Sequence, residues 1–397
     1  MPTLIDDDLF HRAEDLVAAN KDILDDQIAF RGAQWDAGLA IVSFPEGRGG
    51  LGLPPARQAI VDEVLRGNGV EFEDLRINPI GIGMALPTVL TYGSEELKDK
   101  HLRRIFTGED IWSQLFSEPS HGSDVAGIPS RAAKDGDEWV VNGQKVWTTL
   151  AHVSNYGLLL TRTDPNVPKH KGLSYFVLDM HAPGVEIRPL FQMTGEAEFN
   201  EVFLTDVRIH DSQRLGAAGD GWRVATTTLM NERVALSGAP APRGSGHIAD
   251  LIEVWKQHRD CLDPLSRAVA RDRVTALWIE AEVVRLTNLR AKGSAQAGNP
   301  GPEGSVTKLA AAQLSKAIYN CLVDLLGAEG MIHEPGYPME RSSRWTTSGT
   351  GRFMRTRANT IEGGTSEIMR NILGERVLGL PGDVRVDKDV PWSQIPR

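Results

Sequence analysis

The spacing of hydrophobic and polar residues divides the chain into three stretches of different character. Over residues 1–113 the spacing is mostly helical, and apolar and charged positions alternate with a helix-like period across 6–26. Residues 54–65 begin with two prolines, which the first turn of a helix tolerates. Ser94 precedes a further helical pattern and is a suitable N-cap residue. The first stretch is therefore predicted to be a helical domain.

Residues 114–216 change to runs typical of β-strands. Asn142-Gly143 separates two apolar runs, and this dipeptide is the strongest two-residue hairpin signal. The gaps between runs are short and no helix intervenes, which favours an antiparallel sandwich or barrel over parallel βαβ units. Four further predicted strands cover 156–161, 173–178, 185–188 and 201–209.

Helical spacing returns over residues 217–397, where two apolar stripes recur every three or four positions and predict long bundle helices. Between the stripes, 291–305 is rich in Gly, Pro, Ser and Ala and is predicted to be a loop. The expected fold is α+β and multidomain, in the order α (1–113), β (114–216), α (217–397). The stripes are Ala270, Val274, Leu277, Ala281 and Val284, then Leu314, Ala317, Ile318, Cys321, Leu322 and Leu325.

Composition and charge narrow the class of protein. The chain has 397 residues, which suits two or three domains, and 41% of them are hydrophobic, so a packed core is expected and disorder of the whole chain is excluded. Asp plus Glu number 53 against 43 Lys plus Arg, which gives a net charge of −10. This acidic balance argues against a dedicated nucleic-acid binder.

The cysteines and the N-terminus indicate in which cellular compartment the protein is expected. The two cysteines, Cys261 and Cys321, form no CxxC or Cys/His metal spacing, so neither a disulfide scaffold nor a metal site is expected. The N-terminus lacks the basic and apolar regions of a signal peptide. No run of about 18 uncharged apolar residues is present, so no membrane insertion is expected. A cytoplasmic location follows as an expectation.

Two segments of the β stretch carry residues that could contact a ligand. In 115–124, backbone N–H groups and the hydroxyls of Ser117 and Ser123 could bind a heterocycle edge or a phosphate, although an ordinary Ser/Gly/Pro turn has the same composition. In 143–149, Trp147 beside two threonines could stack on a flat cofactor. A core tryptophan on a hairpin strand explains that pattern equally well.

Three features of the last stretch are also candidates. In 361–368, Gly-Gly permits close approach of a ligand and Thr365 caps a helix, whose N-terminus favours anions. Glu232 lies among apolar residues, where a raised pKa would suit a general base, although an ion pair with an arginine is the commoner arrangement. Five arginines could bind phosphates or form a solvated basic face: Arg341, Arg344, Arg352, Arg355 and Arg357.

Taken together, these segments resemble the acyl-CoA dehydrogenase family over about residues 38–381. Members of this family are flavoenzymes that introduce an α,β double bond into acyl-CoA thioesters. Five motifs occur in the family's order and at compatible spacing, which makes the resemblance specific. The matching segments are Gly38–Leu53, Ser117-Glu118-Pro119-Ser-His-Gly122-Ser123-Asp124, Gly143-x-Lys145-x-Trp147-x-Thr149, Phe199–Val207 and Gly364-Thr365-Ser366-Glu367-Ile368.

The resemblance implies FAD as cofactor, bound between the β domain and a C-terminal four-helix bundle. By this resemblance Ser123, Arg233 and Gly363 contact the substrate, and an electron-transfer flavoprotein reoxidises the flavin. The implied flavin contacts are Phe116 and Ser117 at the pyrimidine edge, Trp147 and Thr149 at the ring face and N5 side, Gly122 and Ser123 near the pyrophosphate and the CoA arm, and Thr365 and Glu367 near the ribityl phosphate.

The position of the catalytic carboxylate differs from much of the family, which places it directly before Gly-Thr in the C-terminal turn. Here that position is Gly363, which cannot accept a proton. A minority of members carry the base on the first long helix of the C-terminal domain, just before an arginine, and here that position is Glu232, followed by Arg233. Glu232 is therefore the predicted base, and Glu362 is the alternative.

Two departures concern the FAD half-site that each subunit of this family offers its neighbour. The family's Arg-x-x-Phe-Gly segment is not recognisable, and 263–267 occupies its region. Asp324 stands where an amide is usual, beside a pyrophosphate. A homo- or hetero-oligomer, dimer or tetramer, of related chains is expected, and heteromeric members acting on steroid side-chain CoA esters resemble this chain in having unequal half-sites. The alternative to an active dehydrogenase is a mainly structural partner subunit.

Overall fold

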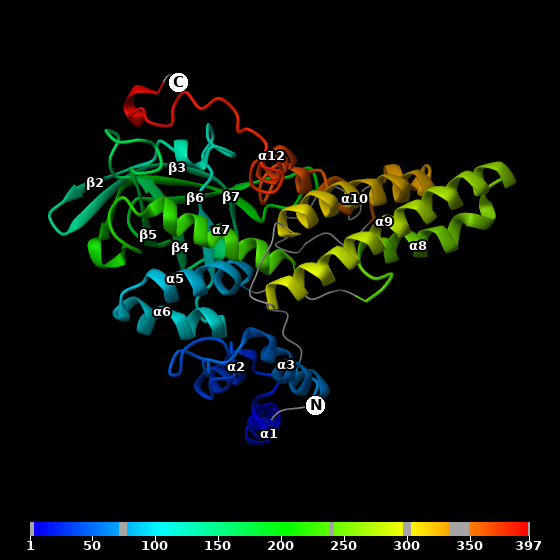
Figure 1. Ribbon diagram of the computed structural model, residues 1–397, viewed down its shortest axis with the longest axis horizontal. Coiled ribbons are helices and arrows are strands. Elements are labelled where there is room, and N and C mark those ends of the chain that lie inside the picture. The colour runs from blue at the N-terminus through cyan, green and yellow to red at the C-terminus, as the bar shows by residue number, and fades with distance from the viewer. Residues whose placement is uncertain (1–3, 71–77, 238–241, 297–302, 333–348, 396–397) are drawn as a thin grey trace. The chain divides into compact units, whose positions relative to one another are not determined.

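The computed structural model describes residues 4–70, 78–237, 242–296, 303–332 and 349–395. The chain forms two compact units (Figure 1). Unit 1 comprises 1–188, 200–232 and 387–397, and unit 2 comprises 189–199 and 233–386. In the described residues, no helix combines the length and the apolar character needed to span a membrane. The three-domain division expected from the sequence stays a prediction.

The beginning of unit 1 is helical as predicted, but two predicted bounds differ. α1 ends at Ala19, so the helical spacing over 6–26 is not one helix, and α3 begins at Gln58, after a 3-10 turn at Pro55–Arg57. A core of their own, containing Leu9, Phe30 and Val61, packs α1, α2 and α3 together. The Ser94 hydroxyl accepts a hydrogen bond from Leu97 N (3.3 Å), so Ser94 caps α6 as predicted. The helices of this region are α1 (Leu4–Ala19), α2 (Gln27–Asp36), α3 (Gln58–Gly67), α5 (Leu86–Tyr92) and α6 (Glu95–Thr107); α7 (Gly221–Ser237) comes after the sheet.

Seven strands form one sheet in the order β1-β4-β2-β3-β7-β6, with β5 paired to β4. The four predicted strands from 156 to 209 are confirmed as β4 to β7. One detail differs from the expected antiparallel arrangement, because β1 and β2 each pair with β4 in parallel. The strands are β1 (Trp112–Leu115), β2 (Arg131–Asp135), β3 (Glu138–Thr149), β4 (Tyr156–Arg162), β5 (Leu173–Asp179), β6 (Val185–Leu190) and β7 (Phe199–His210).

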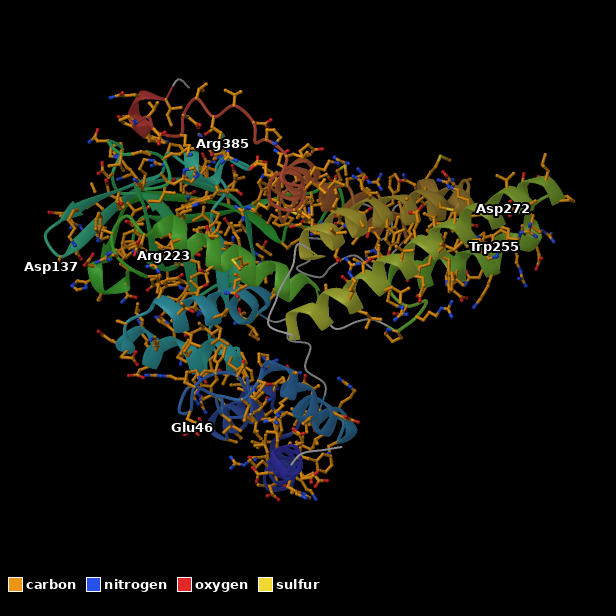
Figure 2. The ribbon with its side chains drawn as sticks, in the orientation of Figure 1. Glu46, Asp137, Arg223, Trp255, Asp272 and Arg385 are labelled. Carbon is orange, nitrogen blue, oxygen red and sulfur yellow. The ribbon has the colours of Figure 1, made fainter. Side chains whose placement is uncertain are left out.

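The hairpin predicted at Asn142-Gly143 is wrong, because β3 runs through both residues. The turn lies earlier, at Gly136-Asp137, where Gly136 has φ of +58° and Figure 2 labels Asp137 at the tip. The Asn142 side chain instead bonds to Asp206 on β7, at 2.9 Å to Oδ1 and 3.0 Å from its N–H. A Cβ on Gly143 would lie 2.0 Å from Ser130 Oγ, so glycine is needed there for close packing and not for a turn.

Both faces of the sheet are covered by apolar side chains within unit 1. On one face, Trp112, Leu158 and Tyr175 share a core cluster with residues of α5, α6 and α7, such as Val224. On the other, residues such as Phe176 form a second cluster with side chains of β3 and β7. The sheet therefore gives rigid support to the loops and strand ends that carry the candidate site.

His101 on α6 is fully buried in the first cluster, and neither of its ring nitrogens has a hydrogen-bond partner among the described residues. Its ring packs edge-on against Trp112 (5.1 Å between centroids) and Tyr156 (4.6 Å). Burial, with smaller contributions from Lys100 and Arg104, lowers the pKa of His101 to about 4. The imidazole is therefore neutral in the folded protein at neutral pH.

His101 should make the protein less stable as the pH falls from about 6.5 to about 4. In this window the unfolded chain binds a proton that the folded chain does not, so protonation favours unfolding. At pH 5 the loss from this group is about 2 kcal/mol relative to pH 7.5. The free energy of unfolding, measured in urea at both pH values, should differ less for His101→Phe, which keeps an aromatic ring, than for the unaltered protein. An equal difference in the two proteins would contradict this role of His101.

Unit 2 is a helical domain whose core joins Ile248 and Leu251 of α8 to the predicted stripes. Both stripes are confirmed as helices, α9 and α10. The loop predicted over 291–305 is wrong at both ends, because α9 continues to Gln296 and α10 begins at Glu303; 297–302 lie outside the described residues. The helices are α8 (His247–His258), α9 (Pro264–Gln296), α10 (Glu303–Leu326), α11 (Gly349–Arg355) and α12 (Ser366–Arg376).

Candidate active site

The predicted flavin-contact residues of unit 1 meet where the loop after β1 crosses β3. Val146 N donates to Ser117 O (2.9 Å), which places Ser117 beside Trp147. Beneath this crossing lies an ion pair, Lys145 Nζ to Glu118 Oε1 at 2.6 Å, with exposed side-chain fractions of 0% and 2%. Lys145 also donates to Phe116 O (3.1 Å). The structure thus brings Phe116, Ser117 and Trp147 together.

The buried pair neutralises its own charge inside the β domain. Glu118 also accepts from Ser130 N, at 3.0 Å to Oε2 and 3.3 Å to Oε1, so the carboxylate has both a cation and an amide donor. Burial lowers the pKa of Lys145, and the Glu118 carboxylate opposes that shift. Since the two charges cancel, the surface above them carries no net charge from this pair, which suits an electrically neutral ring system.

Trp147 has a backbone conformation that large side chains rarely adopt. Its φ is +60°, and its side chain is 55% exposed although tryptophan is usually mostly buried. Such strain persists where the surrounding structure enforces it, and it is concentrated at functional sites. Exposure rules out the alternative in which Trp147 is a core residue of the sheet. Thr149, two residues on, is half-buried at the end of β3.

The predicted base helix, α7, is anchored within unit 1 to α5 and β5. The fully buried Thr228 bonds to Thr88 Oγ1 (2.9 Å) and to the Tyr175 hydroxyl (3.1 Å). The Tyr175 ring in turn packs edge-on against Phe116, with centroids 5.7 Å apart. A chain of contacts therefore links Phe116 to a point on α7 one turn before Glu232.

The side chains of Glu232 and Arg233 lie outside the described residues. Both positions are helical, within α7, in agreement with the helix expected there. Gly122 and Ser123 are exposed in the loop after β1. Their assignment to the pyrophosphate and the CoA arm stays a prediction.

In unit 2, the residues expected at the flavin form the turn before α12. Gly363 and Gly364 have φ of +61° and +94°, and the Thr365 hydroxyl accepts from Ile368 N (3.1 Å), so Thr365 caps α12 as predicted. Lys308 donates to Gly364 O and to Asn359 O and holds the turn against α10. Glu367 is exposed in the first turn of the helix, where the dipole favours a carboxylate.

Glu362, the alternative base, is engaged by an arginine. Arg355 donates from both Nη atoms to the two carboxylate oxygens of Glu362, at 2.9 and 3.0 Å, in a bidentate pair. This bidentate geometry engages both oxygens of the Glu362 carboxylate with the guanidinium of Arg355. Arg355 Nε lies 3.8 Å from the buried carboxylate of Glu198, also in unit 2.

The basic stretch is occupied by protein partners where the structure describes it. Arg352 donates to Asp250 and to the Tyr319 hydroxyl, and Arg357 donates to Asn320 Oδ1 (3.0 Å). Arg341 and Arg344 lie outside the described residues. Arg352 and Arg357 therefore connect helices of unit 2, and Arg355 binds the turn before α12, so these arginines do not form a simply solvated basic face.

Asp324 is not an isolated negative charge. Arg273 Nη1 lies 2.6 Å from Asp324 Oδ2, and both side chains are about half exposed. The pair reduces the repulsion that Asp324 alone would exert on a phosphate. Among the residues that the structure describes, no group of three or more His, Cys, Asp or Glu side chains could hold a metal ion.

Comparison with known proteins identifies the family. The acyl-CoA dehydrogenase N-terminal, middle and C-terminal domains match residues 6–109, 113–207 and 219–378 in turn. A relative in Mycobacterium tuberculosis, acyl-CoA dehydrogenase IpdE1, is 37% identical over 350 residues, which cover 88% of this chain and 86% of that protein. The chain belongs to the acyl-CoA dehydrogenase family.

Solved structures of acyl-CoA dehydrogenases share this fold. The ChsE4–ChsE5 complex from Mycobacterium tuberculosis has a TM-score of 0.69 at 28% identity, covering 96% of this chain and 99% of that chain. The Tcur3481–Tcur3483 steroid acyl-CoA dehydrogenase has a TM-score of 0.71 at 25% identity, covering 95% and 98%. The predicted family and the α–β–α fold class are confirmed.

Acyl-CoA dehydrogenases are FAD-dependent oxidoreductases that act on CH–CH groups, so FAD is the cofactor of this chain. The residues present fit that group. Within unit 1, the exposed aromatic face of Trp147 and the charge-compensated loop at Ser117 have the chemistry to stack on a flavin ring and bond its edge. Within unit 2, the capped N-terminus of α12 at Thr365 favours an anion.

Trp147→Ala should weaken FAD binding while leaving the apoprotein folded. Loss of a stacking face is worth on the order of 1–3 kcal/mol, about 5- to 150-fold in Kd. Because the side chain is 55% exposed, its removal should take little from the core. Bound FAD per subunit and the thermal midpoint of the apoprotein are the measurements, with Trp147→Phe as the control that keeps a ring. A large drop in the apoprotein midpoint would mean that Trp147 is structural.

Sequence reasoning missed the residues that support the site. Glu118 and Lys145 stood inside two recognised motifs, and a buried opposite-charge pair could have been suspected from those motifs alone. Tyr175 and Thr228 carry no such signal, since one lies in a strand run and the other on an ordinary helix. Only the fold places them between Phe116 and α7.

Proposed function

We propose that this chain catalyses α,β-dehydrogenation of an acyl-CoA thioester, with Glu232 as the base that removes the α-proton. The assignment of the base to Glu232 depends on what stands at the two other candidate positions, 362 and 363. Gly363 has no carboxylate, and Glu362 is held by Arg355 in a bidentate ion pair. Glu232 lies on α7, which Thr228 anchors one turn earlier to Tyr175 and Thr88.

The remaining residues orient the substrate and polarise it. A backbone N–H at Gly363, or beside it, donates to the thioester carbonyl and stabilises the charge that develops as the α-proton leaves. Bound FAD supplies the acceptor for the hydride of the β-carbon. Phe116, Ser117, Trp147 and Thr149 hold the flavin ring.

The test is anaerobic reduction of the purified holoprotein by a panel of CoA thioesters. Straight-chain, branched and steroid side-chain thioesters are compared by loss of the oxidised-flavin absorbance. Steroid side-chain thioesters come first, because one structural relative is named a steroid acyl-CoA dehydrogenase. Reduction by at least one thioester, with formation of the 2-enoyl product, is expected. A holoprotein that no thioester reduces would overturn the proposal.

We further infer that an electron-transfer flavoprotein reoxidises the cofactor. Rapid reoxidation by O₂ alone would instead indicate an oxidase.

We also infer that the protein is cytoplasmic. The two cysteines are both free, which agrees with a reducing compartment.

A second candidate is a subunit whose site is completed by a related chain. Two of the similar structures are named as pairs of chains, ChsE4–ChsE5 and Tcur3481–Tcur3483. The unrecognisable Arg-x-x-Phe-Gly segment at 263–267 favours this interpretation. The amount of FAD bound per subunit and the native mass distinguish this subunit from a self-sufficient dehydrogenase. A homotetramer with four tightly bound FAD would exclude unequal sites.

A further inference from the structure

The segment after the C-terminal family match returns to the β domain of unit 1. The C-terminal domain match ends at 378, and residues 387–395, here named the strap, pack on the loop that joins β4 and β5 (red in Figure 1). Trp392 N donates to Val167 O and Ser393 N to Pro165 O, each at 2.9 Å. These backbone bonds fix the strap independently of its side chains.

Two strap side chains are linked to the loop that carries the predicted substrate contacts, residues 118–130, Trp392 directly and Asp387 through Lys169. Trp392 Nε1 donates to Gly127 O (2.9 Å). Asp387 Oδ2 lies 2.6 Å from Lys169 Nζ, and the same ammonium bonds to both carboxylate oxygens of Asp124, at 3.0 and 3.1 Å. One lysine therefore ties the strap to the residue that follows Ser123.

The buried side chain of Arg162, which is 2% exposed, also binds this loop. Its guanidinium donates to Ala126 O (2.6 Å) and Ile128 O (3.2 Å), on either side of the carbonyl that Trp392 binds. Its carbon Cζ lies 4.3 Å from the centre of the Trp392 ring, in cation–π geometry. Arg162 and Trp392, stacked on each other, thus bind three successive carbonyls of the loop, those of Ala126, Gly127 and Ile128.

The part of the loop that faces solvent is the part assigned to the ligand. Gly122, Ser123 and Asp124 are exposed, and a Cβ added to Gly122 would meet no atom within 4 Å. The strap binds the same loop directly at Gly127 and, through Lys169, at Asp124, while Gly122 and Ser123 are exposed. Ordering a loop before a ligand arrives reduces the entropy lost on binding.

We propose that the strap positions the 118–130 loop for the CoA part of the substrate, with Trp392 and Asp387 as positioning residues. The proposal rests on the proposed function and on the prediction from the sequence that Ser123 lies near the CoA arm. Loosening the strap weakens recognition of the nucleotide end of the thioester and leaves the chemistry at the acyl end intact. The effect is therefore expected in KM and not in kcat.

The experiment compares the holoprotein with Trp392→Ala, Asp387→Asn and a chain ending at Val386. Each is assayed with the best CoA thioester and with the N-acetylcysteamine thioester of the same acid, which lacks the nucleotide. Loss of the strap should raise KM for the CoA thioester about tenfold, the equivalent of one buried hydrogen bond, and change kcat by less than about twofold. The N-acetylcysteamine thioester should react with unchanged kcat/KM. Ser393→Ala, an exposed strap residue whose backbone bond is retained, is the matched control.

Binding of free CoA by calorimetry gives a readout without turnover, and the same variants should bind it about tenfold more weakly. Equal losses for both thioesters, with a lowered thermal midpoint, would make the strap a merely structural element and overturn the proposal. Unchanged KM and CoA affinity in the truncated chain would overturn it as well. A wild-type protein that neither binds CoA nor turns over any thioester would overturn the proposed function and the strap's role together.

Discussion

The Glu232→Gln protein is expected to keep its FAD and to lose turnover by about 10²–10⁴-fold, the contribution of a positioned general base. Glutamine has the shape of glutamate and cannot accept the α-proton. The anchoring of α7 by Thr228 does not involve residue 232, so the helix should stay in place. Anaerobic flavin reduction by a good thioester measures the step in which the proton is removed, free of product release or reoxidation.

Glu362→Gln is the matched control for the same chemistry. This change replaces the charged partner of Arg355 and leaves that guanidinium 3.8 Å from Glu198. A loss of stability with turnover reduced by about tenfold or less is expected, because the change disturbs the turn before α12 without removing the base. Near-normal flavin reduction in Glu232→Gln, together with an inactive Glu362→Gln, would move the base to Glu362.

Local patterns predicted most of the elements of this fold. The strands from 156 to 209 and the stripes of α9 and α10 were readable because one face of each element is buried, and burial imposes a period on the sequence. The caps at Ser94 and Thr365 were readable because a hydroxyl must satisfy an open N–H of the first turn. Each of these signals is complete within a few residues.

The errors arose where a distant partner decided the outcome. Asn142-Gly143 has the composition of a turn, yet Asp206 on β7 binds the asparagine and Ser130 needs the space beside the glycine. Tertiary contacts therefore outweighed turn propensity. The parallel pairing of β1 with β4 escaped the sequence for the same reason, since nothing in a single strand specifies the direction of its neighbour.

The candidate site shows the same difference between features set by a local motif and features set by distant contacts. Trp147 and Thr365 could be assigned from motifs, but the contacts that orient them come from other elements. The pairing of Arg355 with Glu362 bears on the choice between two candidate bases, and no sequence pattern indicates it. The strap is separated from Gly127 by 265 positions in the chain, so its role is visible only in the fold.

Lys145→Met is expected to have the largest effect on stability. The change leaves the Glu118 carboxylate buried at 2% exposure, with Ser130 N as its remaining donor among the bonds described above. Removing one partner of a buried ion pair costs about 3–5 kcal/mol, because the other charge is left uncompensated. FAD occupancy should fall as well, because Lys145 also holds Phe116 O beside Ser117. Urea unfolding of the apoprotein and FAD titration are the two measurements.

The double variant Glu118→Gln with Lys145→Met separates the charge from the packing. The amide oxygen of the introduced glutamine can still accept from Ser130 N, and methionine fills much of the volume of the lysine stem, so no charge is left buried. The double variant should therefore be more stable than Lys145→Met alone. In a double-mutant cycle, the coupling free energy between the two changes should be stabilising, opposite in sign to the loss of stability caused by Lys145→Met. If both variants are equally unstable, the cost comes from lost packing and not from the isolated carboxylate. If Lys145→Met unfolds at the same urea concentration as the unaltered protein, the pair contributes nothing to the stability of the β domain, and its position under Ser117 and Trp147 needs another explanation.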